Sequence, residues 1–140
     1  MADSIRDVMT PDPATFTPDQ PVAEAAKAMS SGDFGAVVVV ENGGGVRGIL
    51  TDRDIVVRAV AEGKDPTSTE ISEVFTTEPT TLSPDDSLDQ AVNALRDNQV
   101  RRLPVVEGSE VVGIVSIGDL AQARDEKSAL ADISAAEPNN

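Results

Sequence analysis

The sequence predicts a mixed fold, of the α+β or α/β class, in which two tandem β-α-β-β-α units pack against each other as a pseudo-twofold pair. Three observations support this prediction: an internal repeat, the same order of local patterns in both halves, and a glycine-containing turn between two apolar runs in each half. The chain has 140 residues, of which 39% are hydrophobic, so it has the material for a core shared by two small units.

The repeat emerges when the sequence is shifted by 66 residues. The segment IRDVMTPDPATFTPD (5–19) then aligns with ISEVFTTEPTTLSPD (71–85). The first unit has one extra residue in its glycine turn, after which the shift is 65 and GILTDRDIV (48–56) aligns with GIVSIGDLA (113–121). A register kept over this length predicts two structurally equivalent units.

The predicted boundaries follow from this alignment. The first unit spans 5–61, the second spans 71–126, and the polar stretch 62–70 links them. Residues 127–140 lack a core pattern and are predicted to form a C-terminal tail. Neither unit alone has enough apolar surface for a stable core, so we expect the two to pack together.

Both units show the same order of local patterns. Helices are expected at 22–31 and 88–98, because their apolar residues recur at helical spacing. Ser87 and Gln90 match a capping box at the start of the second of these helices. An extended segment precedes each helix, and a strand hairpin and a further helix follow it. The expected bounds are 14–16, 34–40, 46–50 and 52–61 in the first unit, and 80–82, 100–106, 111–115 and 117 to about 125 in the second.

Composition argues against several classes of function. The net charge is −14 and the chain has three Phe, no Tyr and no Trp, so it lacks the basic and aromatic surface typical of nucleic-acid binding. It has no Cys and no His, which removes disulfides and the commonest general base and metal ligand. We therefore expect neither an enzyme nor a metal site. No signal-peptide pattern or run of ~20 apolar residues occurs, which predicts a cytoplasmic protein that does not cross a membrane.

A hydroxyl and an aspartate three residues apart stand at the same place in both units. They are Thr51 with Asp54 and Ser116 with Asp119, each where an apolar strand gives way to a helix. One interpretation is structural, because such a pair caps a helix and contributes about 1 kcal/mol. The other is functional, because the hydroxyl can donate to a phosphate oxygen and the carboxylate can accept two ribose hydroxyls. The pattern alone leaves both interpretations open.

The doubled pattern resembles a pair of CBS motifs, the arrangement called a Bateman module, in a stand-alone bacterial protein. The resemblance rests on PATFTPD, VVVVENGGGVRGILTDRDIV, PTTLSPDDSLDQAVNAL and VRRLPVVEGSEVVGIVSIGDLA, and it covers roughly residues 5–125. It implies two β-α-β-β-α motifs packed through their sheets, two clefts between them, and a homodimer. It also implies that the clefts bind adenosine-containing ligands such as AMP, ADP, ATP or NAD, although some members bind none.

The resemblance further assigns roles to residues. It implies that Asp54 and Asp119 hold ribose hydroxyls and that Thr51 and Ser116 approach phosphate or ribose. It places Thr15, Thr81, Val37, Leu103 and Pro104 in the walls around the base.

Two arginines are the expected phosphate partners, Arg53 and Arg102, because a guanidinium group matches phosphate oxygens. Surface salt bridges are the alternative role for both. The two sites are not expected to be equivalent, because the second unit has Arg-Arg-Leu-Pro at 101–104 where the first has Gly-Ala-Val-Val at 35–38.

The predicted function is therefore regulatory binding of an adenine nucleotide, with no required cofactor and an unknown downstream protein partner. The alternative is a ligand-free module for dimerisation or protein interaction.

Overall fold

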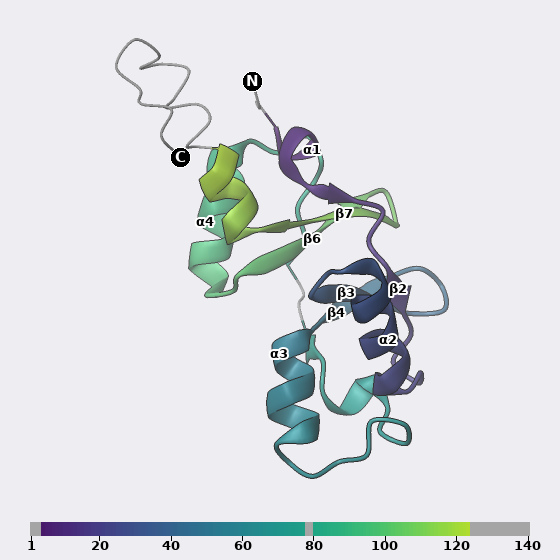
Figure 1. Ribbon diagram of the computed structural model, residues 1–140. Helices are drawn as coiled ribbons and strands as arrows, with labels where there is room; N and C mark the ends of the chain where they lie inside the picture. Colours follow the sequence, from purple (N-terminus) through teal and green to yellow (C-terminus); the bar gives the residue numbers. More distant parts are fainter. Residues whose placement is uncertain (1–3, 78–79, 124–140) are drawn as a thin grey trace.

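The computed structural model describes residues 4–77 and 80–123, which form two lobes (Figure 1). The predicted tail at 127–140 and the end of the second unit lie outside the described residues. The elements are α1 (Ile5–Val8), β1 (Thr10–Pro11), β2 (Thr15–Phe16), α2 (Val22–Gly32), β3 (Ala36–Val40), β4 (Val46–Thr51), α3 (Asp52–Asp54), the π-helix η1 (Ile55–Val60), the 3₁₀-helix η2 (Ile71–Glu73), β5 (Thr76–Thr77), α4 (Leu88–Asn98), β6 (Arg102–Glu107), β7 (Glu110–Ser116) and a last helix at 117–123.

Each lobe combines one sheet with helices, which confirms the mixed fold of two equivalent units. The first lobe contains a four-stranded sheet in the order β2-β3-β4-β5, with α2 and the α3–η1 helix beside it. The second contains a three-stranded sheet in the order β1-β7-β6, with α4 and the helix at 117–123 (Figure 1). Within the described part of the chain, no helix has the length and apolar character that a membrane span requires.

The long helices begin and end as local chemistry dictates. In α4, the Gln90 backbone N–H donates to Ser87 Oγ at 3.1 Å and the Ser87 N–H donates to Gln90 Oε1 at 2.7 Å, which confirms the predicted capping box. Both helices end on a left-handed residue, Asp33 (φ 58°) and Gln99 (φ 55°). Each helix buries one apolar side: Val22, Ala25 and Met29 in α2, and Leu88, Ala91 and Leu95 in α4.

One strand hairpin forms the centre of each lobe: β3–β4 in the first and β6–β7 in the second. Val37 on β3 lies opposite Leu50 on β4, and Leu103 on β6 lies opposite Val115 on β7. All four side chains are fully buried, as expected for strands covered on both faces. The turn of the second hairpin has Gly108 at a φ of 66°, a left-handed conformation that favours glycine.

Each repeat begins in the lobe of the other repeat. β1, from the start of the first repeat, pairs with β7 and places Thr10 opposite Ile114. β5, from the start of the second repeat, pairs with β4 and places Thr76 opposite Ile49. No local pattern in the sequence predicts this exchange, because a two-residue strand carries no signal for its partner.

Buried side chains make the same exchange. Ile5 is buried in the core of the second lobe, and Ile71 and Val74 are buried in the core of the first. The linker at 62–70 is also tied down, because the Val22 N–H donates to the Thr69 carbonyl at 2.9 Å. These long-range contacts hold the two lobes together.

The last helix of the first lobe differs from the expected regular helix at 52–61. After one turn, α3, it continues as the π-helix η1, in which the Ala61 N–H donates to the Val56 carbonyl five residues back at 2.8 Å. Four of the six residues of η1 are β-branched, and such side chains crowd the turns of a tight α-helix. The wider helix leaves Val56, Val57 and Val60 exposed.

Candidate functional site

The two hydroxyl–aspartate pairs lie where β4 meets α3 and where β7 meets the last helix. The Asp54 N–H donates to Thr51 Oγ1 at 3.0 Å, and the Thr51 N–H donates to Asp54 Oδ2 at 3.0 Å. Ser116 and Asp119 form the same two bonds at 3.1 and 3.0 Å. Both pairs are therefore helix caps, which the structural interpretation anticipated. Capping is compatible with binding, because it occupies one oxygen of each carboxylate.

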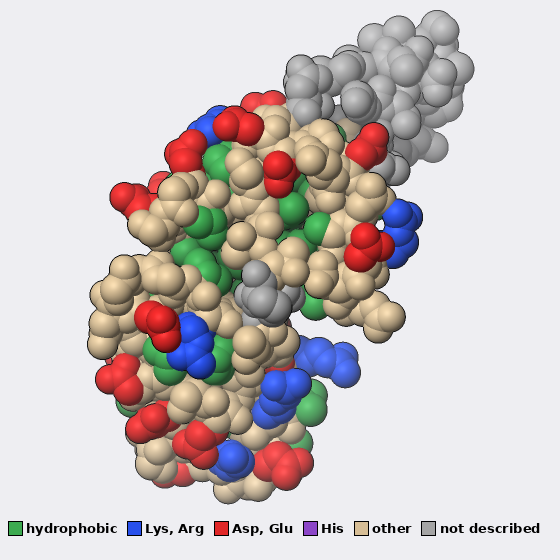
Figure 2. All heavy atoms as spheres, turned by 180° about the vertical axis from the view of Figure 1, so that it is seen from behind, with side chains coloured by type: hydrophobic (Ala, Val, Ile, Leu, Met, Phe, Trp, Pro, Cys, Tyr) green, Lys and Arg blue, Asp and Glu red, His purple; other side chains and the backbone are tan. Residues whose placement is uncertain are grey.

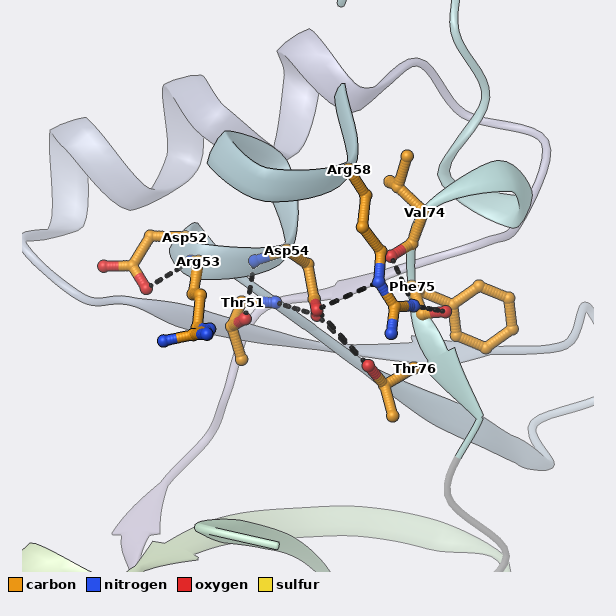
Figure 3. Close-up of polar contacts among 8 residues, drawn as sticks. All are labelled: Thr51, Asp52, Arg53, Asp54, Arg58, Val74, Phe75 and Thr76. Atoms are coloured by element: carbon orange, nitrogen blue, oxygen red, sulfur yellow. Dashed lines mark hydrogen bonds and ion pairs between the residues drawn. The ribbon is translucent and has the colours of Figure 1, made fainter. Parts of the chain in front are cut away.

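The second oxygen of Asp54 meets residues from two other elements (Figure 3). Thr76 Oγ1 donates to Asp54 Oδ1 at 3.3 Å, and Arg58 Nε lies 4.0 Å from the same oxygen. The guanidinium of Arg58 also donates to the carbonyls of Val74 and Phe75, each at 3.4 Å. The Asp54 side chain is 13% exposed, so these contacts position a carboxylate that is largely withdrawn from solvent.

A first cleft of about 460 Å³ lies between the lobes beside this carboxylate. The first lobe contributes Thr51, Arg53 and Asp54 to its lining, and the start of β6 contributes Arg102. Four predicted site residues therefore come together here, from both repeats. The other lining residues are Ile49, Thr76, Gln99, Val100 and Arg101.

A second cleft of about 270 Å³ lies at the other hydroxyl–aspartate pair. Ser116 and Asp119 line it, and Arg102 lines it as well as the first cleft. The remaining lining comes from both repeats: 10–14, 34–36 and Ile114. The two clefts are thus related by the repeat but differ in their side chains.

Five residues expected around the base do not line either of these clefts. Val37, Leu103 and Pro104 are buried within their lobes, because both hairpins are covered on both sides. Thr15 is exposed on β2, and Thr81 is exposed next to Leu82, which forms an isolated β-bridge with Val105 in place of the expected extended segment.

The arginine side chains of the first cleft differ from the other basic side chains. Within the described residues, the guanidinium groups of Arg53, Arg101 and Arg102 form no ion pair or hydrogen bond, whereas every other Lys and Arg has a partner. Figure 2 shows acidic side chains spread over both lobes, and some of the basic side chains lie beside the hollow where the lobes meet. The other described basic side chains pair as follows: Arg6 with Asp85 and Glu107, Lys27 with Glu24, Arg47 with Glu41, Arg58 with Asp54, Lys64 with Glu73, and Arg96 with Asn93.

Sequence reasoning missed two functional candidates, Arg101 and Thr76. Arg101 precedes Arg102 directly and carries the same charge, so composition alone gave no reason to prefer one. Thr76 reaches Asp54 only through the exchange of β5 into the first lobe. The only available signal was its equivalence to Thr10 in the repeat.

The sequence matches the CBS domain family twice, over residues 5–60 and 71–126. The CBS domain-containing protein YhcV of Bacillus subtilis is 45% identical over 118 residues, which cover 84% of this chain and 83% of that one. The crystal structure of the CBS-domain-containing protein ATU1752 from Agrobacterium tumefaciens is similar, with a TM-score of 0.75, 31% identity, and coverage of 89% of this chain and 95% of that one.

A second solved structure is the CBS domain pair of protein MJ0100 in complex with 5′-methylthioadenosine and S-adenosyl-L-methionine. It has a TM-score of 0.78 and 26% identity, and the match covers 89% of this chain and 97% of that one. With two family matches at the two repeats and solved relatives of the same fold, the chain belongs to the CBS domain family and carries two CBS motifs in tandem.

Proposed function

We propose that this CBS pair is a regulatory module that senses an adenosine-containing nucleotide bound in the clefts between its repeats. The observation that carries the proposal is the first cleft, where three arginines without partners among the described residues line the same space as Thr51 and Asp54. Phosphate and ribose are the chemical groups that this set suits. Protein MJ0100, at 26% identity, binds two ligands that contain adenosine.

Asp54 is the proposed ribose contact. Its Oδ1 accepts from Thr76 at 3.3 Å, longer than the about 2.7–2.8 Å of a strong O–H···O bond, so a ribose hydroxyl would replace a weak contact. Arginine forks bind phosphate oxygens through two parallel N–H groups. Ile49 and Val100 supply apolar surface on which the base can lie.

A ligand in the first cleft would contact both repeats. Asp54 belongs to the first repeat, whereas Arg101 and Arg102 belong to the second. The nucleotide therefore binds best to the arrangement of the lobes that brings both sides within reach. Differential affinity for two arrangements is what a sensor needs in order to pass on a signal.

Asp54→Asn and Asp119→Asn test this proposal. Asparagine keeps one oxygen for the helix cap but loses the second carboxylate oxygen. By calorimetry with adenosine, AMP, ADP, ATP, NAD and S-adenosylmethionine, we expect each variant to lose affinity about tenfold in its own cleft. Asp97→Asn, at an exposed position of α4 outside both clefts, is the matched control. Wild-type protein that binds none of these compounds, or variants that bind as wild type, would reject nucleotide sensing.

A second candidate function, dimerisation, is favoured by an apolar surface on the last helix of each lobe. Val56, Val57 and Val60 are 58%, 47% and 59% exposed, and Ile117 is 45% exposed. An apolar groove of about 300 Å³ lies between Ile117 and α4. Because the two helices are equivalent in the repeat, a second copy of the chain suits both of them, and we propose a homodimer.

The double variant Val57→Asp/Val60→Asp tests the dimer. Two carboxylates on this surface are expected to shift the protein from dimer to monomer in sedimentation equilibrium, while Ser31→Asp on the exposed side of α2 leaves the mass unchanged. A wild-type protein that sediments as a monomer at all concentrations would reject the homodimer.

A further inference from the structure

The two clefts carry opposite charge. The first is lined by Arg53, Arg101 and Arg102 against a single carboxylate, that of Asp54. The second is lined by two carboxylates, those of Asp12 and Asp119, against Arg102 alone. The net charge of the chain is −14, which repels anions in general, so the excess of arginines in the first cleft sets this cleft apart from the rest of the protein.

The aspartates of the two hydroxyl–aspartate pairs also differ in their charged neighbours. Asp54 has a cationic neighbour, because Arg58 Nε lies 4.0 Å from its Oδ1. The residue equivalent to Arg58 in the second repeat is Ala123, and Asp119 has no ion pair within the described ranges. A cavity of about 170 Å³ lined by Asp119 and Ala123 lies in this region of the second lobe. Among the described residues, Arg102 is therefore the one basic residue that lines the cleft with Asp119.

A further carboxylate lies beside the second cleft. A Cβ placed on Gly35, which lines that cleft, would be 3.0 Å from Asp52 Oδ2. Among the described residues, the other oxygen of Asp52 accepts from the backbone N–H of Arg53, at 2.8 Å, and not from its guanidinium. The Arg53 side chain extends away from Asp52 toward the space between the lobes, as Figure 3 shows.

We propose that the two clefts divide their ligands by charge. The first takes a nucleoside di- or triphosphate, whose phosphate chain meets the three arginines. The second takes an adenosine derivative without a phosphate chain, neutral or cationic, because phosphates there would face the carboxylates of Asp12 and Asp119, with that of Asp52 beside them. This inference rests on the proposed function for the adenosine part of each ligand, but the phosphate preference of the first cleft follows from the arginines alone.

Inorganic tripolyphosphate tests the phosphate preference without a nucleoside. In an NMR titration of ¹⁵N-labelled protein, we expect shifts in the backbone and side-chain N–H signals of Arg53 and Arg101, and none at Ser116 or Asp119. Arg101→Gln, which changes a residue lining only the first cleft, is expected to weaken binding about tenfold. Lys27→Gln removes the same charge from an exposed position of α2 and leaves binding unchanged. No binding, binding at Ser116 and Asp119, or equal losses in both variants overturn the inference.

A nucleotide series tests the division between the clefts. In the first cleft, affinity is expected to rise at least tenfold from adenosine to ADP, and Arg101→Gln is expected to lower the affinity for ADP but not for adenosine. In the second cleft, adenosine is expected to bind more tightly than ADP. If adenosine compounds bind but both clefts rank them alike, this inference fails and the proposed function stands. If tripolyphosphate binds at the arginines but no adenosine compound binds, the proposed function fails, and the division of adenosine ligands fails with it.

Discussion

The hydroxyl of Thr76 donates a hydrogen bond to the carboxylate of Asp54, at 3.3 Å from Oδ1, although the two residues belong to different repeats. The bond exists because β5, at the start of the second repeat, is paired with β4 at the end of the first hairpin. The equivalent residue in the other lobe, Thr10, has no side-chain hydrogen bond within the described residues. In the first lobe, the exchanged strand is therefore hydrogen-bonded to the aspartate that caps α3, whereas in the second lobe Thr10 makes no such side-chain bond within the described residues.

Thr76→Val is expected to lower the free energy of unfolding by about 1 kcal/mol, because it removes one hydrogen bond to a charged group that is largely buried. Urea unfolding followed by circular dichroism measures the change, since the chain has no Trp or Tyr for fluorescence. Thr10→Val is the matched control and should change stability by less than about 0.5 kcal/mol. Equal losses in both variants would show that the bond to Asp54 does not stabilise the fold.

Two glycines allow the exchanged strands to approach so closely. A Cβ on Gly48 would overlap the carbonyl oxygen of Thr76, and a Cβ on Gly113 would lie 3.0 Å from the carbonyl oxygen of Thr10. Gly48→Ala is expected to cost about 1–3 kcal/mol, because backbone atoms cannot yield without loss of strand pairing. Thermal unfolding measures both variants. Gly113→Ala should lose less stability than Gly48→Ala, because part of its clash is with the flexible side chain of Met9.

The control for these glycines is Gly43→Ala. A Cβ at Gly43 meets nothing within 4 Å, so the free energy of unfolding of this variant should lie within about 0.5 kcal/mol of the wild-type value, and its unfolding temperature should be equal or slightly higher. A Gly48→Ala variant as stable as Gly43→Ala would contradict the close approach of β5 to β4.

The helix caps at Thr51 and Ser116 predict a second pair of stability changes. Thr51→Ala and Ser116→Ala each remove a hydroxyl that accepts from the backbone N–H three residues on, at 3.0 and 3.1 Å. Each variant is expected to lose about 1 kcal/mol in urea unfolding, without any ligand present. If either loss is absent without ligand and appears only when a ligand is added, the hydroxyl acts in binding rather than in capping.

The linker predicts a pH-dependent contact. The Thr67 hydroxyl donates to Asp65 at 2.7 Å, and the Thr67 backbone N–H donates to it at 3.0 Å. These bonds, the hydroxyl bond most of all, hold the pKa of Asp65 below its ordinary value. A lowered pKa means that this stabilisation is fully present above the ordinary pKa and is lost as the pH falls through the lowered one. Thr67→Ala is expected to raise the pKa of Asp65 toward its ordinary value, as measured by ¹³C NMR titration. An unchanged pKa would assign the effect to the backbone N–H alone.

The sequence alone determined the features that depend on neighbours along the chain. The capping pairs, Ser87 with Gln90 and the two hydroxyl–aspartate pairs, involve residues three apart, so their geometry is set once a helix begins. The bounds of α2 and α4 followed from the 3.6-residue period, and the hairpins followed from apolar runs around glycine turns. The repeat then fixed the equivalence of the two units.

Only the tertiary structure decided what lies across the clefts. Val37 and Leu103 were expected to line a base but are buried, because both faces of each hairpin are covered. Thr76 reaches Asp54, and Arg101 joins the first cleft, only because segments far apart in the sequence are packed side by side. Such pairings minimise exposed apolar surface over the whole chain, and a short strand or a single arginine carries no local record of them.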